Sequence, residues 1–175
     1  MSVVIGCSSG EERVVDPALE DYFQNLAANM QVELDCVAAQ NNEAILEAKS
    51  DEGRLIATDA VLSGFVSCAE VPLDELEGLD PPPDAQSAHE LFVKLEAEFL
   101  AFNRQMAKIA TDALSAESLD AADAIVEINA SFVFIGTPGG LSFRIRDACL
   151  ALQRIADEND IDEDLICAVN DLEPT

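Results

Sequence analysis

One apolar stripe in the middle of the chain constrains the fold more than any other feature. Between residues 88 and 113, apolar side chains recur at alternating spacings of four and three. Such spacing places them on one face of a helix, and a face this long must be covered by other helices. The stripe therefore predicts a helix of about seven turns inside a bundle. Its members are Ala88, Phe92, Leu95, Phe99, Phe102, Met106, Ile109 and Ala113.

Proline and N-cap signals delimit the other helices. Asp16-Pro17 predicts the start of a first helix, because aspartate is a favoured N-cap and proline fits the first helical position. The prolines of Leu79-Asp80-Pro81-Pro82-Pro83 cannot continue a helix, and we expect Asp84 to cap the next one. A further helix is expected to begin at Ser115 or Ser118. Residues 17–70 form either one helix or two, since Gly53 only weakly favours a break.

The segment Gly136-Thr137-Pro138-Gly139-Gly140 interrupts the apolar pattern, which resumes at helical spacing from Leu141. It is not a phosphate-binding loop, because Leu141-Ser142 stands where such a loop requires lysine followed by serine or threonine. We therefore predict an all-α fold, an up-down bundle of four to five helices stapled by disulfides. The domain is expected to span residues 17–167, preceded by an acidic tether (1–16) and followed by a tail (168–175).

The first of the five cysteines resembles a lipidation site. Val4-Ile5-Gly6-Cys7 resembles the bacterial lipobox, in which the cysteine becomes the acylated N-terminus, and the polar Ser8–Glu12 resembles the tether of such lipoproteins. The six residues before Cys7 lack the basic and apolar regions of a signal peptide, so this interpretation requires a start further upstream.

The other four cysteines are expected to form disulfides. Cys36 and Cys68 are symmetric about the turn candidate Ser50–Gly53, and an antiparallel helical hairpin turning there would place them opposite each other. Cys149 and Cys167 flank the expected end of the last helix, and closing that loop of about 17 residues would contribute about 3 kcal/mol. One acylated cysteine and two disulfides account for an odd total of five. The alternative is a cytoplasmic chain with reduced thiols, and the sequence alone leaves the connectivity open.

The net charge restricts the classes of molecule that the chain is expected to bind. The chain has 35 acidic and 9 basic residues, a net charge of −26 and a pI near 4.1. Nucleic acids and anionic lipid would be repelled, because their binding depends on lysine and arginine. Cations and basic proteins are the expected soluble partners.

Candidate catalytic and metal sites are sparse. His89 is the only histidine, so neither a histidine-rich zinc site nor a histidine-based dyad is indicated, and we expect it to pack beside the proline elbow. Asp160, Asp162 and Asp164 alternate like calcium ligands, but Leu165 replaces the glycine such a loop needs, leaving a weak metal candidate. No catalytic residue and no cofactor is predicted.

Four motifs in this order carry a resemblance that spans most of the chain from Cys7 to Cys167. They are the lipobox Val-Ile-Gly-Cys, the first-helix sequence ALEDYF, the proline elbow LDPPPDAQSAH, and a C-terminal ACLALQ segment followed by a cysteine. With these motifs the chain resembles a loose group of uncharacterised bacterial secreted helical lipoproteins. The resemblance implies export, lipid on Cys7 and a bundle, and it implies no reaction.

The sequence therefore predicts a non-enzymatic, extracytoplasmic protein, attached to the membrane through lipid at Cys7. Its expected role is to bind a partner protein or a small ligand at the cell envelope. Two alternatives are a cytoplasmic acidic interaction protein (an inhibitor, an immunity factor or a nucleic-acid mimic) and a metal-dependent enzyme that uses clustered carboxylates.

Overall fold

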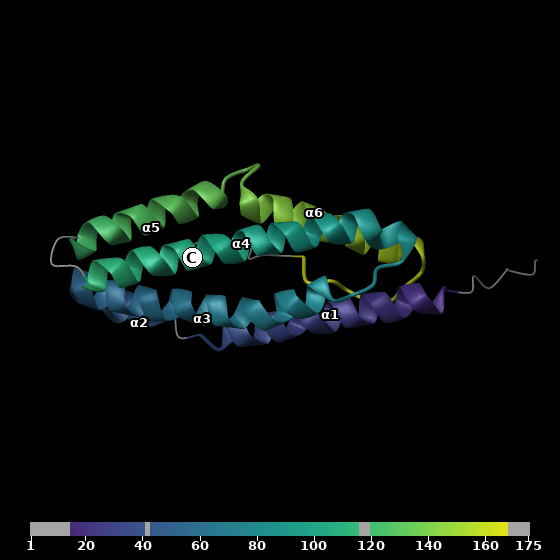
Figure 1. The fold of residues 1–175 in the computed structure, drawn as a ribbon, viewed down its shortest axis with the longest axis horizontal. Helices are drawn as coiled ribbons and strands as arrows, with labels where there is room; N and C mark the ends of the chain where they lie inside the picture. Colours follow the sequence, from purple (N-terminus) through teal and green to yellow (C-terminus); the bar gives the residue numbers. More distant parts are fainter. Residues whose placement is uncertain (1–14, 41–42, 116–119, 168–175) are drawn as a thin grey trace, which may run out of the picture.

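The computed structural model describes residues 15–40, 43–115 and 120–167. Within these ranges every regular element is a helix, as Figure 1 shows. Five long helices and the short α2 confirm the predicted all-α, up-down bundle of four to five helices. The elements are α1 (Pro17–Ala38), α2 (Glu43–Glu47), α3 (Asp51–Glu77), α4 (Pro83–Ser115), α5 (Ala121–Ile135) and α6 (Leu141–Glu158).

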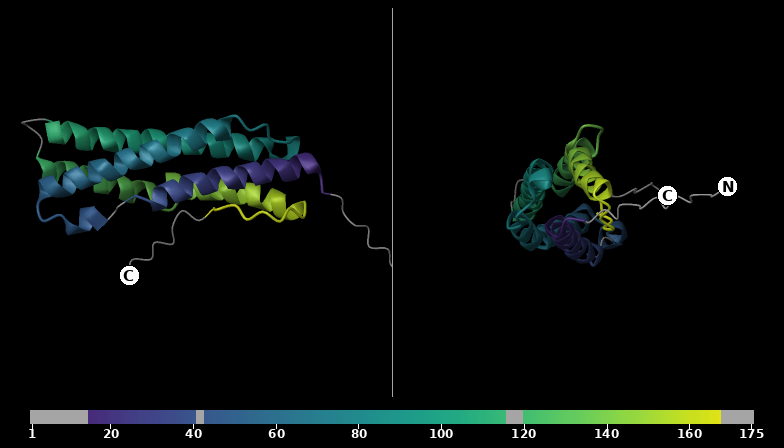
Figure 2. Two further views of the ribbon diagram at one scale, coloured as in Figure 1. Left: turned by 90° about the horizontal axis from the view of Figure 1, so that it is seen from below. Right: turned by 90° about the vertical axis from the view of Figure 1, so that its right-hand side faces the viewer.

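The helices are arranged in four antiparallel columns (Figures 1 and 2). The long helices α3 and α4 run the length of the bundle. One outer column is α1 followed by α2. The other is α5 followed by α6, and these two helices run in the same direction. Each outer column is therefore interrupted near the middle of the molecule, at the end of α1 and at the start of α6.

The core consists of two clusters, one toward each end. The first lies under α1 and α6 and includes Phe23, Leu26 and Leu152, each 0% exposed. The second lies under α5 and includes Leu55 and Ile128. Each such side chain contributes about 1.5–3 kcal/mol when fully buried. The predicted stripe on α4 contributes side chains to both clusters. Phe92 and Leu95 belong to the first cluster, and Met106 and Ala113 belong to the second.

The predicted helix starts are partly right. Asp16 caps α1, because its Oδ1 accepts a hydrogen bond from the Ala18 backbone nitrogen at 3.0 Å. Asp84 is not a cap: α4 begins one residue earlier, at Pro83, since proline itself fits the first helical position.

The predicted start of the fifth helix is wrong. Ser115 is the last residue of α4, and Ser118 lies outside the described residues. The helix α5 begins at Ala121, where Asp120 Oδ1 accepts from the Ala122 nitrogen at 3.1 Å. Aspartate and serine are N-caps of similar strength, so residue preference alone did not distinguish Asp120 from the earlier serines.

The segment between α5 and α6 is an interruption, as predicted. Gly136 ends α5 and Gly140 is the N-cap of α6. A Cβ at Gly140 would lie 2.4 Å from the Ile135 carbonyl oxygen, so only glycine fits there.

Both predicted disulfides are present. Cys36 is bonded to Cys68 with the Cα atoms 5.5 Å apart, and Cys149 to Cys167 with the Cα atoms 5.3 Å apart. The turn assumed for the first pair is wrong, because Ser50 is the N-cap of α3 and Gly53 lies in its first turn. The chain reverses earlier, between α1 and α3, where α2 also lies.

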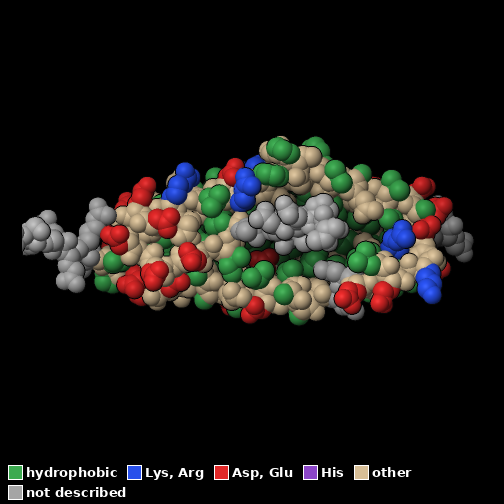
Figure 3. Space-filling view, turned by 180° about the vertical axis from the view of Figure 1, so that it is seen from behind, with side chains coloured by type: hydrophobic (Ala, Val, Ile, Leu, Met, Phe, Trp, Pro, Cys, Tyr) green, Lys and Arg blue, Asp and Glu red, His purple; other side chains and the backbone are tan. Residues whose placement is uncertain are grey.

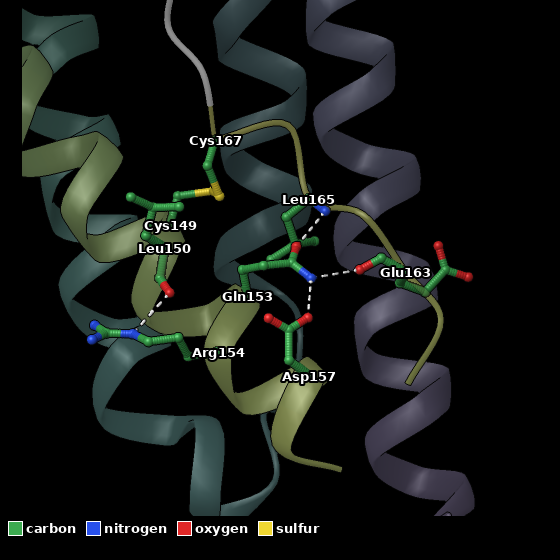
Figure 4. The surroundings of a disulfide bond; sticks show 8 residues. All are labelled: Cys149, Leu150, Gln153, Arg154, Asp157, Glu163, Leu165 and Cys167. Atoms are coloured by element: carbon green, nitrogen blue, oxygen red, sulfur yellow. Dashed lines mark hydrogen bonds between the residues drawn. A yellow bond between two sulfur atoms is a disulfide. The ribbon is translucent and has the colours of Figure 1, made fainter. Parts of the chain in front are cut away.

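After α6 the chain turns back along that helix. Asp160, with φ of 57°, allows the reversal. Figure 4 shows Gln153 holding the returning segment: its Oε1 accepts from the Leu165 nitrogen at 2.7 Å, and its Nε2 donates to the Glu163 carbonyl at 3.0 Å. With Ile161 and Leu165 buried in the first cluster, this segment lies between α6 and α1 (Figure 4).

Among the described helices, α3 is long and apolar enough to cross a membrane by length and composition, with a window of mean hydropathy 1.3. Only 28% of that window is buried. However, α3 packs against α1, α2, α4 and α5, and core helices of soluble proteins also meet these criteria. We therefore describe α3 as a helix of the bundle.

Candidate functional site

A cavity of about 250 Å³ lies in the middle of the bundle. It is bounded by the last turns of α1, the start of α6, the C-terminal half of α3 and the central part of α4. Both outer columns are interrupted at this level, so neither provides a continuous helix beside the cavity. On the face in Figure 3, hydrophobic side chains line a hollow that is visible beside the grey residues. We call this cavity the central pocket.

The walls of the central pocket are mostly apolar. The helix α1 contributes three of these side chains, α3 five, α4 three and α6 one, and one more comes from the returning segment. They are Met30, Leu34, Val37, Phe65, Ala69, Pro72, Leu73, Leu76, Phe92, Phe99, Leu100, Ile145 and Ile166.

Two carboxyl groups interrupt the apolar wall, Glu33 on α1 and Glu96 on α4. Both are partly buried. Neither makes a side-chain hydrogen bond or an ion pair within the described part of the chain. Burial raises the pKa of Glu33, and burial together with repulsion from Glu33 raises the pKa of Glu96 to about 8. At neutral pH Glu96 therefore holds a proton.

A third polar group is incompletely satisfied. Asn103 on α4 is only 3% exposed and lines the central pocket. Its Nδ2 donates to the Phe99 carbonyl at 2.9 Å, so its Oδ1 must be the acceptor, and this atom has no partner among the described residues. A buried acceptor without a partner costs about 1–3 kcal/mol.

Asn29, by contrast, has a structural role in the wall. Its Nδ2 donates to the Pro72 carbonyl at 2.9 Å and lies 3.5 Å from Glu75 Oε2. These bonds join α1 to α3 at the edge of the central pocket.

The residues singled out in the sequence lie elsewhere. Cys7 is outside the described residues. His89 is 5% exposed, and its Nδ1 lies 3.0 Å from the Tyr22 hydroxyl, so it is a buried core residue. Burial lowers the pKa of His89, and the neighbouring Glu90 partly opposes this.

The weak metal candidate is not assembled. In the part of the chain that the structure describes, no group of three or more His, Cys, Asp or Glu side chains is placed to share a metal ion. Asp160, Asp162 and Asp164 therefore do not form the cation site that their spacing suggested. Residues 161–167 form no regular secondary structure, whereas a calcium loop curls its ligands inward around the ion.

Glu33, Glu96 and Asn103 were not predicted from the sequence as site residues. A signal was available, because Glu96 lies four residues after Phe92 and three before Phe99, on the apolar face of α4. With 35 acidic residues in the chain, one carboxylate at an apolar position did not stand out.

Comparison with protein-family models, with curated proteins and with solved structures finds no match. What the site can do must therefore be argued from its own chemistry.

Proposed function

We propose that this chain is a non-enzymatic binding protein of the cell envelope, attached to the membrane through lipid at Cys7, which takes up a small, largely apolar ligand in the central pocket. The observation that carries the proposal is the pocket itself, an apolar cavity with unsatisfied polar groups. Ligand sites are concave and mostly apolar, with a few polar groups that fix orientation.

The volume sets the size of the ligand. An apolar cavity of about 150 Å³ accommodates a benzene molecule. By the same ratio, 250 Å³ holds a ligand of about ten non-hydrogen atoms. A much larger molecule would have to extend out of the pocket.

The two disulfides support the proposed compartment. Such bonds persist in oxidising environments and are rare in the cytosol. Cys36, Cys68, Cys149 and Cys167 are all paired, which leaves Cys7 as the fifth cysteine. A diacylglycerol on Cys7 would supply two acyl chains, enough for stable attachment to a membrane.

The membrane attachment is tested by expressing the gene with its natural upstream sequence. The native protein should partition into the detergent phase, and the Cys7→Ser variant should stay in the aqueous phase. If both partition equally into the aqueous phase, the lipid anchor is rejected.

The pocket is tested with methyl-labelled methionine and NMR. Met30 lines the central pocket, whereas Met106 is buried in the second cluster and serves as an internal control. Titration with 1-hexanol, a neutral probe of suitable size, should shift the Met30 signal and leave the Met106 signal in place. Ala69→Leu, which fills the pocket, should abolish the shift, and Ala101→Leu on the exposed face of α4 should not. An unmoved Met30 signal would refute a binding role for the pocket.

A further inference from the structure

We propose that the ligand of the central pocket is an organic cation, with an ammonium group bound by Glu33, Glu96 and Asn103 and a hydrocarbon body against the apolar wall. This inference rests on the proposed binding function and adds the chemistry of the ligand head group.

The polar groups of the central pocket that lack a hydrogen-bond partner all present oxygen atoms. Two carboxyl groups and the Oδ1 of Asn103 face the pocket without partners among the described residues. A carboxylate and an amide oxygen accept hydrogen bonds, and an ammonium group offers up to three N–H donors and no acceptor. The ligand head group that satisfies the whole set is therefore a donor with a positive charge.

No element around the pocket supplies that charge itself. Glu33 is the only titratable side chain that α1 contributes to the lining, and Glu96 the only one from α4. The lining residues of α3 are apolar, α6 contributes Ser142 and Ile145, and the returning segment contributes Ile166. Among these described lining residues there is no lysine, arginine or histidine. Partly buried carboxyl groups without a counter-charge are costly, and a bound cation would remove that cost.

The aromatic side chains favour the same ligand. Phe65, Phe92 and Phe99 line the pocket, one from α3 and two from α4. An ammonium group is attracted to the face of an aromatic ring, and more strongly where water is excluded. A carboxylate ligand would meet two carboxyl groups and the electron-rich ring faces, so the pocket should exclude it.

Binding should also displace a proton. Because burial and, to a smaller extent, repulsion from Glu33 keep Glu96 protonated at neutral pH, a cation must compete with that proton. The apparent affinity should therefore rise with pH up to about 8, where Glu96 ionises unaided, and level off above it.

The experiment compares three probes with one hydrocarbon chain: hexylammonium, 1-hexanol and hexanoate, each titrated into the intact, disulfide-bonded protein near pH 8. The Met30 methyl signal reports the central pocket, and Met106 controls for cations attracted to the surface of a chain with a charge of −26. We expect hexylammonium to bind at least about tenfold more tightly than 1-hexanol, as one desolvated charge-assisted contact allows, and hexanoate not to bind.

Two variants test the residues. Glu33→Gln and Glu96→Gln should each reduce the preference for hexylammonium over 1-hexanol to a few-fold, while 1-hexanol still binds. Glu90→Gln, which removes an exposed carboxylate from the same helix as Glu96, should leave the preference unchanged. This control makes the same glutamate-to-glutamine substitution outside the pocket.

The outcomes separate the two proposals. If 1-hexanol binds as tightly as hexylammonium to the native protein, or if the preference survives both glutamine variants, the cation inference is wrong and the binding function stands. If hexylammonium shifts Met30 and Met106 alike, its attraction is to the surface and the inference is also wrong. If none of the three probes shifts Met30, both proposals fall.

Discussion

Replacing Glu96 by glutamine should stabilise the folded chain by an amount that grows with pH. In the folded protein the pKa of Glu96 is about 8, against an ordinary value of 4.5 for a glutamate. Between these two values the folded state holds a proton that the unfolded chain has lost. Stability therefore falls as the pH rises through this window, by about 1.4 kcal/mol per pH unit. The contribution is fully retained below pH 4.5 and lost once the pH exceeds about 8.

The size of the stability loss follows from the width of the pH range between the two pKa values. Integrated from pH 4.5, the loss in the native protein reaches at most about 3 kcal/mol at pH 7 and about 5 kcal/mol at pH 9. Glutamine keeps the shape of the side chain and cannot ionise, so the variant should not share this loss. Its advantage over the native protein should grow by these amounts, which are large relative to the 5–15 kcal/mol that typically stabilises a domain.

The assay is urea denaturation followed by far-ultraviolet circular dichroism, at about pH 5, 7 and 9 and without reductant. Circular dichroism suits a helical chain that contains no tryptophan. Glu90→Gln is the matched control, since Glu90 is exposed on the same helix, and it should follow the native protein between pH 7 and 9, where His89 is neutral in both. If the curves of stability against pH for the native protein and Glu96→Gln run parallel, the reasoning about the pocket carboxyl is refuted.

The remaining predictions concern stability under the same assay. Cys149→Ser should lower the free energy of unfolding by about 3 kcal/mol, since it opens a loop of about 17 residues, and adding reductant to the variant should have a smaller effect than adding it to the native protein. Tyr22→Phe should cost about 1–3 kcal/mol because it removes the partner of His89 Nδ1 in a buried site. Gly140→Ala should also destabilise, by about 1–3 kcal/mol, because the new methyl group would meet the Ile135 carbonyl at 2.4 Å; no change in the urea midpoint would show that the segment relaxes freely.

The sequence was sufficient for the helical class because its strongest signals are local. The stripe on α4 and the cap at Asp16 depend on neighbouring residues alone. Cys149 and Cys167 were paired because they flank the end of the last helix, whereas Cys36 and Cys68 were paired correctly about a turn that the structure does not have. The exact first residue of each helix was harder to predict from the sequence. At α4, proline and aspartate compete for the first positions, and local pattern does not decide between them.

The central pocket could not be predicted, because it is a property of how the columns are offset. Its carboxyl groups come from α1 and α4, which are separated by more than sixty residues in sequence. Periodicity states which face of each helix is apolar, but not how far one helix is shifted along another. The interruption at residues 136–140 was visible as a break in pattern. The end of α1 was not, because the only break considered there was at Ser50–Gly53, and the meeting of the two interruptions at one level of the bundle could not be seen either.

The charge of the whole molecule and the chemistry of the pocket favour the same ligand for different reasons. A net charge of −26 attracts cations to the surface and raises their rate of encounter, an effect that salt screens beyond about 8 Å at physiological ionic strength. Glu33 and Glu96 act inside the bundle, where screening is weaker. Added salt should therefore slow the association of hexylammonium while changing its dissociation rate little. A salt-sensitive dissociation rate would mean that the surface, rather than the pocket, retains the cation.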